Sequence, residues 1–487
     1  MTRPNFIFFI PDQLRADALG SFGSTVAQTP HLDAFATTAT RMTNAFTQHS
    51  VCSPSRVSFL TGLYPHTRGR RTLTDLIRTD EPNLLRYLKE DGYHVTHIGQ
   101  RGDTFAPGAT ELSVSDYGFV VEPNVSTFGR FSGSDMGTAM PRTFYHGCIV
   151  EPEGTIDNDE AMTLSAEAWL ADAPDQPWAL YMPLFAPHCP FAVTEPWHSM
   201  YDRAAMPERA QHESGHEPAY VQHIRDMWGL DDVTDGQWRE IQAVYFGMIS
   251  RMDDQFGRLI SALEAHGLRE NTVILFFADH GEYLGDFGLV EKWPAGVHEV
   301  LVRDPLMIGG PSLQAGEASD ALVELVDVMP TVLDLAGIAT TETHFGRSLV
   351  PLLRGETSEH RDYVFSEGGF LATEEPGFET PPPPYDLKGR VQHEFPEAVG
   401  RCVAVRDHEW TYVWRMYEPC ELYSRTDDPQ ETRNLAAIPE YANRVAAMHQ
   451  VLLEWTLRTS DVMSMAPTPR FPDIHSPSPA ERLANAK

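Results

Sequence analysis

Short apolar runs alternate with amphipathic segments along the first two thirds of the chain. Runs of this length that are rich in aromatic and β-branched residues are typical of strands buried on both faces of a sheet. They cover residues 5–10, 93–98, 178–185 and 272–278. Because helical patterns separate these runs, the sequence predicts an α/β fold with a mostly parallel central sheet flanked by helices.

The clearest helical pattern follows Thr234. Apolar residues recur at helical spacing from Ile241 to Leu263, and Gly267 ends the pattern. We assign this stripe to the core rather than to a cofactor site. Asp253 and Asp254 lie within the helix. Because adjacent helix residues point to different faces, we expect these carboxylates to be solvated rather than to form a metal site.

The pattern changes after about residue 355. Short segments there predict antiparallel strands, interrupted by an insert rich in Glu and Pro around residues 381–384. The strand segments are 362–366, 402–406, 410–415 and 421–424. A closing helix is predicted over 439–457, and the tail from Met463 is predicted to be an extended arm that packs on the body or on a partner subunit. We expect an α/β domain over 1–355 and a C-terminal subdomain over 356–487.

The net charge of the chain excludes some classes of binding partner. The chain of 487 residues has 69 acidic and 37 basic side chains, which gives a formal net charge of −32. Nucleic acid and anionic membrane surfaces would be repelled, so we exclude both as partners. A local anion site held by a metal ion and a few cationic side chains is compatible with this charge.

Five cysteines are too few and too scattered for a disulfide framework in a chain of this length. They are Cys52, Cys148, Cys189, Cys402 and Cys420. The apolar start of the chain lacks the features of a signal peptide. No segment reaches the ~18 uncharged apolar residues that a membrane helix needs. We therefore expect a cytoplasmic protein.

Residues 49–70 carry the most specific motif, with the sequence HSVCSPSRVSFLTGLYPHTRGR. Its core runs from Cys52 to Arg56, and the match extends over about fifteen positions. An isolated cysteine would be interpreted as a small buried hydrophobe. The extended motif instead resembles the signature of the formylglycine-dependent sulfatases, which belong to the alkaline phosphatase superfamily. The resemblance implies that a formylglycine-generating enzyme oxidises Cys52 to 3-oxoalanine, whose hydrate supplies the attacking oxygen.

Two further segments offer metal ligands where strands end, which is the edge at which α/β sheets bind their ligands. Asp12 and Gln13 follow the first strand, and Asp279 and His280 follow the strand over 272–278. Such donors suit Ca²⁺ or Mn²⁺, and also Mg²⁺. The resemblance implies that these four residues and the modified Cys52 bind one divalent ion. Sulfatases often have two Asp residues where this chain has Asp-Gln, a pair that resembles choline sulfatases and phosphonate monoester hydrolases.

The same resemblance assigns the substrate-binding cations. It implies that His188 and Lys292 bind the sulfuryl oxygens and the leaving oxygen, that Arg56 steadies the aldehyde hydrate, and that Asp279 accepts a proton. Negative charge shifts to the leaving oxygen in the transition state, which explains cations at that position. Glu282 and Asp286 are expected to stabilise their loop.

One segment departs from the family pattern. Family members usually have Gly-Lys-x-His after the strand at 93–98, whereas this chain has Gly99-Gln100-Arg101-Gly102-Asp103. Arg101 can replace the lysine charge and bind substrate, because its planar fork suits an oxyanion. No histidine stands in the expected place.

The sequence therefore predicts a sulfatase that hydrolyses a small-molecule sulfate ester to an alcohol and inorganic sulfate. One alternative is a phosphonate monoester or phosphodiester hydrolase that uses the same site, and another is a catalytically inert relative that binds an anion. A homo-oligomer is compatible with the sequence. Residues considered for the wall of the substrate pocket are Arg70, Arg71, the loop over 128–145 and the insert near Pro381.

Overall fold

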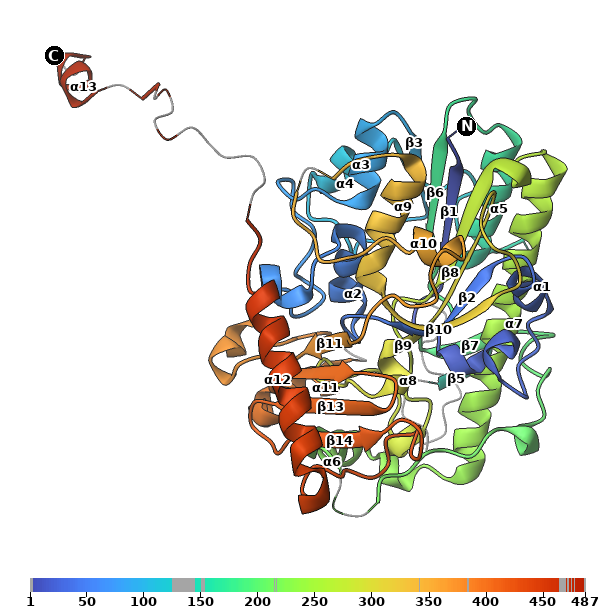
Figure 1. Cartoon of the computed structure of the whole chain (residues 1–487). Helices are drawn as coiled ribbons and strands as arrows, with labels where there is room; N and C mark the ends of the chain where they lie inside the picture. The colour runs from blue at the N-terminus through green and yellow to red at the C-terminus, as the bar shows by residue number, and fades with distance from the viewer. Residues whose placement is uncertain are drawn as a thin grey trace.

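An eight-stranded sheet lies at the centre of the N-terminal part of the chain (Figure 1). The computed structural model describes residues 3–124, 145–149, 154–213, 215, 217–340, 342–382, 385–463, 470, 473, 475–476 and 478–485. The strands of this sheet are β1 (Asn5–Ile10), β2 (Thr40–Phe46), β3 (His94–Ile98), β4 (Asp116–Gly118), β6 (Trp178–Pro183), β8 (Thr272–Phe277), β9 (Arg303–Gly309) and β10 (Ala318–Glu324). Their spatial order is β10-β2-β9-β8-β1-β6-β3-β4.

The sheet is mostly parallel, which confirms the predicted fold class. Only β9 runs antiparallel to its neighbours, β2 and β8, among the strand pairs of this sheet in the described part of the chain. The four predicted strands correspond to β1, β3, β6 and β8 within a few residues. The sequence did not predict β2, β4, β9 and β10.

Helices cover both faces of the sheet (Figure 1). The helices of the described residues are α1 (Pro30–Ala36), α2 (Cys52–Thr61), α3 (Leu84–Glu90), α4 (Ala109–Ser113), α5 (Asn158–Ala171), α6 (Ala219–Trp228), α7 (Asp235–Ala265), α8 (Glu299–Val302), α9 (Val328–Ala336), α10 (Val350–Leu353), α11 (Asp386–Glu394), α12 (Ala442–Thr459) and α13 (Pro479–Asn485). Strand β1 is buried on both faces. Ile7 and Phe9 pack with α1, α5 and α7, whereas Phe6 and Phe8 pack with α2, α3 and α9.

Helix α7 confirms the predicted amphipathic helix, and its first turn has a capping box formed by Thr234 and Gln237. The expectation that Asp253 is solvated is wrong. Its side chain is buried, and its carboxylate accepts hydrogen bonds from His31 N at 3.1 Å and Leu32 N at 2.7 Å. These amides belong to the first turn of α1, where backbone N–H groups have no partner within the helix. Asp253 therefore caps a neighbouring helix.

A second, antiparallel sheet contains β11 (Val364–Gly368), β12 (Cys402–Arg406), β13 (Trp410–Arg415) and β14 (Glu421–Ser424). All four predicted C-terminal strands are confirmed, the first displaced by two residues. Helix α12 packs on this sheet through Met448, Leu452 and Trp455. The domain boundary near residue 355 stays a prediction.

Two strands form a small separate parallel sheet, β5 (Tyr145–Ile149) with β7 (Phe191–Thr194). All five cysteines are free thiols. In the part of the chain that the structure describes, no helix has the length and apolar character needed to cross a membrane. The predicted packing of the tail falls largely on residues outside the described ones.

Replacing Asp253 with alanine is expected to lower the free energy of unfolding by about 1–3 kcal/mol, because two buried N–H groups lose their acceptor. Asp254→Ala is the matched control, since it removes a carboxylate from the adjacent position, and a change within about 0.5 kcal/mol is expected. Urea unfolding curves measure both. Equal losses in the two variants would show that Asp253 does not cap α1.

Candidate functional site

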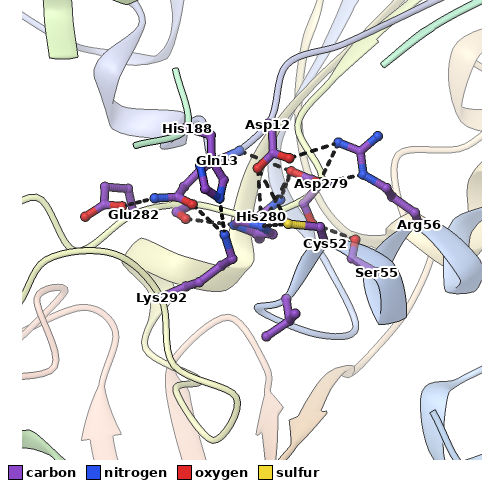
Figure 2. A network of polar contacts seen from close by, with 12 residues as sticks. Asp12, Gln13, Cys52, Ser55, Arg56, His188, Asp279, His280, Glu282 and Lys292 are labelled. Atoms are coloured by element: carbon purple, nitrogen blue, oxygen red, sulfur yellow. Dashed lines mark hydrogen bonds and ion pairs between the residues drawn. The ribbon is translucent and has the colours of Figure 1, made fainter. Parts of the chain in front are cut away.

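The predicted nucleophile and metal ligands meet at the carboxyl edge of the central sheet (Figure 2). Asp12 follows β1, Asp279 and His280 follow β8, and Cys52 is the first residue of α2. One ligand atom from each lies within 4.8 Å of the others, and all four side chains are buried. The thiol Sγ of Cys52 lies 3.3 Å from His280 Nε2 and 3.8 Å from Asp12 Oδ1. Three distant segments therefore form one compact donor set.

Arg56 joins the two carboxylates of this set. Its side chain is fully buried, with Nη2 at 3.2 Å from Asp12 Oδ2 and 2.8 Å from Asp279 Oδ2. Its Nε donates to Asp279 Oδ2 at 2.9 Å. Ser55 adds a bond from its hydroxyl to the Asp279 carbonyl at 2.6 Å. Helix α2 thus holds both strand ends in place while presenting Cys52 to them.

The surrounding cations keep the site ionised. Burial alone would raise the pKa of Asp12, but Arg101, His188, Lys292 and Arg56 together hold this pKa well below its usual range. Asp12 is therefore an ionised carboxylate within a buried site, as a ligand of a divalent cation must be.

The orientation of His280 also fits a metal ligand. Its Nδ1 lies 2.9 Å from the carbonyl oxygen of Gly281, so a proton on Nδ1 is donated to that oxygen. The lone pair of Nε2 then faces Asp12 and Cys52, at 3.6 Å from Asp12 Oδ1. Burial lowers the pKa of His280, which favours the neutral imidazole that metal ions bind. Two carboxylates and one imidazole suit Ca²⁺ or Mn²⁺, so the residues present fit a divalent ion.

Gln13 lies beside this set in an unusual backbone conformation, with a φ of 65°. Its backbone N–H donates to Asp279 Oδ1 at 3.1 Å, and its carbonyl accepts from Tyr245 at 2.8 Å. Its side-chain oxygen accepts from Lys292 Nζ at 2.6 Å, and its Nε2 donates to Glu282. The assignment of Gln13 as a metal ligand stays a prediction.

The two residues expected to assist the leaving group are adjacent. Lys292 Nζ lies 2.7 Å from His188 Nε2, as Figure 2 shows. Burial alone would lower the pKa of Lys292, yet its negatively charged neighbours raise this pKa well above the usual value. Lys292 is therefore an ammonium that points toward the donor set.

Arg101 reaches the same site from the loop after β3. Its guanidinium binds Asp12, donates from Nε to Asp103 Oδ2 at 2.9 Å, and donates from Nη1 to the Leu184 carbonyl at 2.5 Å. The side chain also covers the Phe185 ring, with Cζ 4.5 Å from the centroid. Arg101 thus supplies a cation where the family pattern has lysine, and substrate binding by Arg101 stays a prediction.

The contacts of Glu282 and Asp286 agree with the expected loop-stabilising role. Glu282 accepts from the backbone of Leu284 at 2.9 Å and of Glu291 at 2.6 Å. Asp286 accepts from Ala210 N and from Arg15, each at 2.7 Å.

The residues considered for the wall of the pocket differ in their surroundings. Arg70 is buried and pairs with Glu81, so it is a structural residue rather than pocket surface. Arg71 pairs with Glu374 at 3.3 Å. Residues 128–144 of the loop lie outside the described residues.

Sequence reasoning missed several polar residues next to the site. They are Asp103, Asp159, Glu291, Tyr385 and Lys388. Asp159, for example, accepts from the backbone of Phe185 at 2.9 Å and of Ala186 at 2.7 Å, and so holds the segment that leads to His188. None of these residues belongs to a motif with a chemical meaning. A buried charge opposite another buried charge is visible only in the fold.

Comparisons with known proteins agree with this arrangement. The family model described as Sulfatase matches residues 4–338, which is more than half of the chain. An arylsulfatase from Clostridium perfringens (strain 13 / Type A) is 25% identical, over 93% of this chain and 94% of its own length. The multifunctional alkaline phosphatase superfamily protein PehA from Trinickia caryophylli is 28% identical, over 95% of this chain and 96% of its own length.

Solved structures share the fold. The phosphonate monoester hydrolase of Agrobacterium radiobacter superimposes with a TM-score of 0.75 at 24% identity, covering 96% of this chain and 100% of that protein. This similarity confirms the alkaline phosphatase-like fold that the resemblance implied.

Metal binding is expected to stabilise the protein. Mn²⁺ or Ca²⁺ at a hundred times its dissociation constant should raise the free energy of unfolding by about 2.7 kcal/mol relative to chelator-treated protein. Asp279→Ala and His280→Ala should lose this gain, and Asp254→Ala should keep it. Chemical unfolding with and without metal measures the difference. Full stabilisation of the Asp279 and His280 variants would place the metal elsewhere.

Proposed function

Because the chain belongs to the sulfatase family, whose members are sulfuric ester hydrolases, we propose that it hydrolyses the sulfate ester of a small-molecule alcohol to the alcohol and inorganic sulfate. The nucleophile derives from formylglycine at position 52, made by a formylglycine-generating enzyme, and one divalent ion completes the site. The observation that carries the proposal is the convergence of Cys52 with Asp12, Asp279 and His280. Unpaired cysteines fit the reducing cytoplasm, which is the expected location.

The nucleophile half of the site has defined roles for its residues. The bound cation and the aldehyde hydrate would together supply an acidified hydroxyl group that attacks sulfur. The second hydroxyl of the hydrate would then lose its proton and re-form the aldehyde, which breaks the bond to the sulfated oxygen and releases inorganic sulfate. Asp12, Gln13, Asp279 and His280 would hold the cation. Arg56 orients Asp12 and Asp279 through Oδ2 of each carboxylate. Oδ1 of Asp279, which Arg56 does not bind, is the atom to which we assign acceptance of the hydroxyl proton.

The leaving-group half consists of His188 and Lys292. An alcohol leaves as an anion unless it is stabilised or protonated during bond cleavage. Lys292 Nζ and His188 Nε2, at 2.7 Å from each other, are close enough to contact a single leaving oxygen. We assign Lys292 to the stabilisation of negative charge on that oxygen. His188 binds the neighbouring sulfuryl oxygen and orients the ester.

A second candidate is hydrolysis of phosphonate monoesters or phosphodiesters. Two features of this chain favour it: Gln13 stands where many sulfatases have a second aspartate, and Arg101 brings a guanidinium to Asp12 where the family pattern has lysine. The similarity to a relative named multifunctional supports keeping a second activity as a candidate. An inert anion-binding relative is the third candidate.

The deciding test compares matched aryl sulfate, aryl phosphate monoester and phenylphosphonate ester with protein co-produced with the modifying enzyme and loaded with Mn²⁺ or Ca²⁺. Aryl sulfate should be the preferred substrate. Cys52→Ala should lower kcat/KM by about 10³-fold or more, because the nucleophile is lost. Cys148→Ala, which removes an exposed thiol elsewhere, should leave turnover unchanged.

Other outcomes assign the remaining candidates. Preference for the phosphonate ester would replace the sulfatase proposal by the second candidate. An unmodified thiol at position 52 in protein from its own source cell, measured by mass spectrometry, together with no turnover of any ester, would identify an inert relative.

Arg101→Met is expected to lower kcat/KM about 10- to 100-fold at saturating metal, as for the loss of a charge-assisted hydrogen bond to substrate. Arg101→Lys should recover part of this loss, because the charge returns without the planar fork. Arg86→Met, which removes a half-buried arginine on α3 paired with Glu90, is the control. If the Arg101→Met variant binds metal more weakly but keeps its kcat/KM at saturating metal, Arg101 only holds Asp12 and does not bind substrate.

A further inference from the structure

The C-terminal insert reaches the leaving-group half of the site through α11. Its Lys388 is buried, and Nζ lies 3.3 Å from Glu291 Oε2. Glu291 in turn lies 3.2 Å from Lys292 Nζ through its other carboxylate oxygen, Oε1. One carboxylate therefore stands between two buried ammonium groups, and only one of them, Lys292, points to His188.

A second contact, made by the residue before the same helix, lies beside His188. Tyr385, the residue that precedes α11, donates from its hydroxyl to the Cys189 carbonyl at 3.4 Å and lies 3.7 Å from Cys189 Sγ. The same carbonyl is the partner of His188 Nδ1. Lys388 thus contacts Glu291, the residue before Lys292, and Tyr385 contacts Cys189, the residue after His188.

Helix α11 is held in place by contacts with the segment around Glu379. Glu379 lies 3.9 Å from Lys388 Nζ, accepts from Gln392 Nε2 at 2.8 Å, and donates its backbone N–H to Gln392 Oε1 at 2.9 Å. A Cβ at Gly389 would lie 2.6 Å from the Glu379 carbonyl oxygen, so the helix packs directly on this segment. The two lysines and the two glutamates, Glu291 and Glu379, balance in charge.

Glu291 is fixed in a conformation that disfavours most residues. Its φ is 71°, and its backbone N–H is bound to Glu282 at 2.6 Å. Non-glycine residues in the left-handed region are retained where surrounding contacts determine the backbone, which happens most often at functional sites. The backbone at Glu291 is therefore held by its contact with Glu282, independently of the ion pair between its carboxylate and Lys292.

From these contacts we propose that α11 positions the leaving-group pair, with Lys388 acting through Glu291 on Lys292 and Tyr385 acting through Cys189 on His188. The inference rests on the proposed ester hydrolysis. Without Lys388, Glu291 would be neutralised by Lys292 alone and would draw that ammonium away from His188 and the leaving oxygen. Lys388 and Tyr385 are positioning residues, since neither is placed against the reacting atoms.

The test compares two esters that differ only in the leaving group, 4-nitrophenyl and phenyl, in the ester class that the wild type hydrolyses. Lys388→Met should lower kcat/KM for the phenyl ester about 10- to 100-fold, which is part of the roughly 10²–10³ that loss of one donor to a developing oxyanion costs. The loss for the 4-nitrophenyl ester should be only a few-fold, because this stable anion needs little assistance. Lys388→Arg should restore part of the phenyl ester rate.

Controls separate positioning from general damage. Arg390→Met removes a cation from the same helix, where it is exposed and paired with Glu394, and should change neither rate. In a Glu291→Gln background, Lys388→Met should have little further effect, because the two residues act in series. Tyr385→Phe should also lower the phenyl ester rate more than the 4-nitrophenyl ester rate.

Crystal structures of the wild type and Lys388→Met give a readout that does not need turnover. The expected result is that Lys292 Nζ moves from His188 Nε2 toward Glu291. Equal losses on both esters, or an unmoved Lys292, would overturn the inference. If the wild type hydrolyses no ester, the proposed function fails, while the displacement of Lys292 still decides whether Lys388 positions it.

Discussion

The buried ion pairs of Arg56 with Asp12 and Asp279 are the interaction on which the site depends. A fully buried guanidinium requires partners, since an unpaired charge in the interior is strongly destabilising. Its partners lie at the ends of two adjacent strands, β1 and β8. Because Cys52 and Arg56 are four residues apart on one helix, they share a face. The contact that neutralises Arg56 therefore also places Cys52 against the same two carboxylates.

The backbone is strained in the two segments that carry the site. Six non-glycine residues in the described part of the chain have positive φ. Four of them lie in the two segments that follow β1 and β8, namely Gln13, Leu284, Phe287 and Glu291. Such conformations persist only where the surrounding structure determines them. Here the determining contacts are buried: Asp279 binds Gln13 N, and Glu282 binds the amides of Leu284 and Glu291.

The sequence predicted the parts of the fold that have a simple periodicity. Strands β1 and β8 are continuous apolar runs because both faces of the sheet are covered. Strand β2 was missed because its sequence, TRMTNAF, mixes polar and apolar residues, and β10 was missed because its first half is exposed. Asp253 was misjudged because helical geometry describes one helix and cannot show that the N-terminus of α1 lies against it.

The residues of the site also divide into those that the sequence could predict and those that it could not. Cys52, Asp12, Asp279 and His280 belong to segments that resemble the sulfatase family, so the resemblance implied them as a group. The ion pair of Lys388 with Glu291 could not be predicted, because Lys388 is almost a hundred residues further along the chain and has no motif around it. A contact between buried charges depends on the tertiary fold, and the sequence shows only that both residues are charged.

The two halves of the site consequently depend on different parts of the chain. The nucleophile half is built from strand ends and α2, elements of the central sheet whose geometry is fixed by the core. The leaving-group half is built from loops that α11 supports. The sulfuryl group is common to all sulfate esters, whereas the alcohol differs from one ester to the next. In the proposed reaction the alcohol leaves beside His188 and Lys292, whose neighbours Cys189 and Glu291 are held by Tyr385 and Lys388. Changes at these two supporting residues are therefore expected to act on departure of the alcohol, while the ion pairs of Arg56 stay intact.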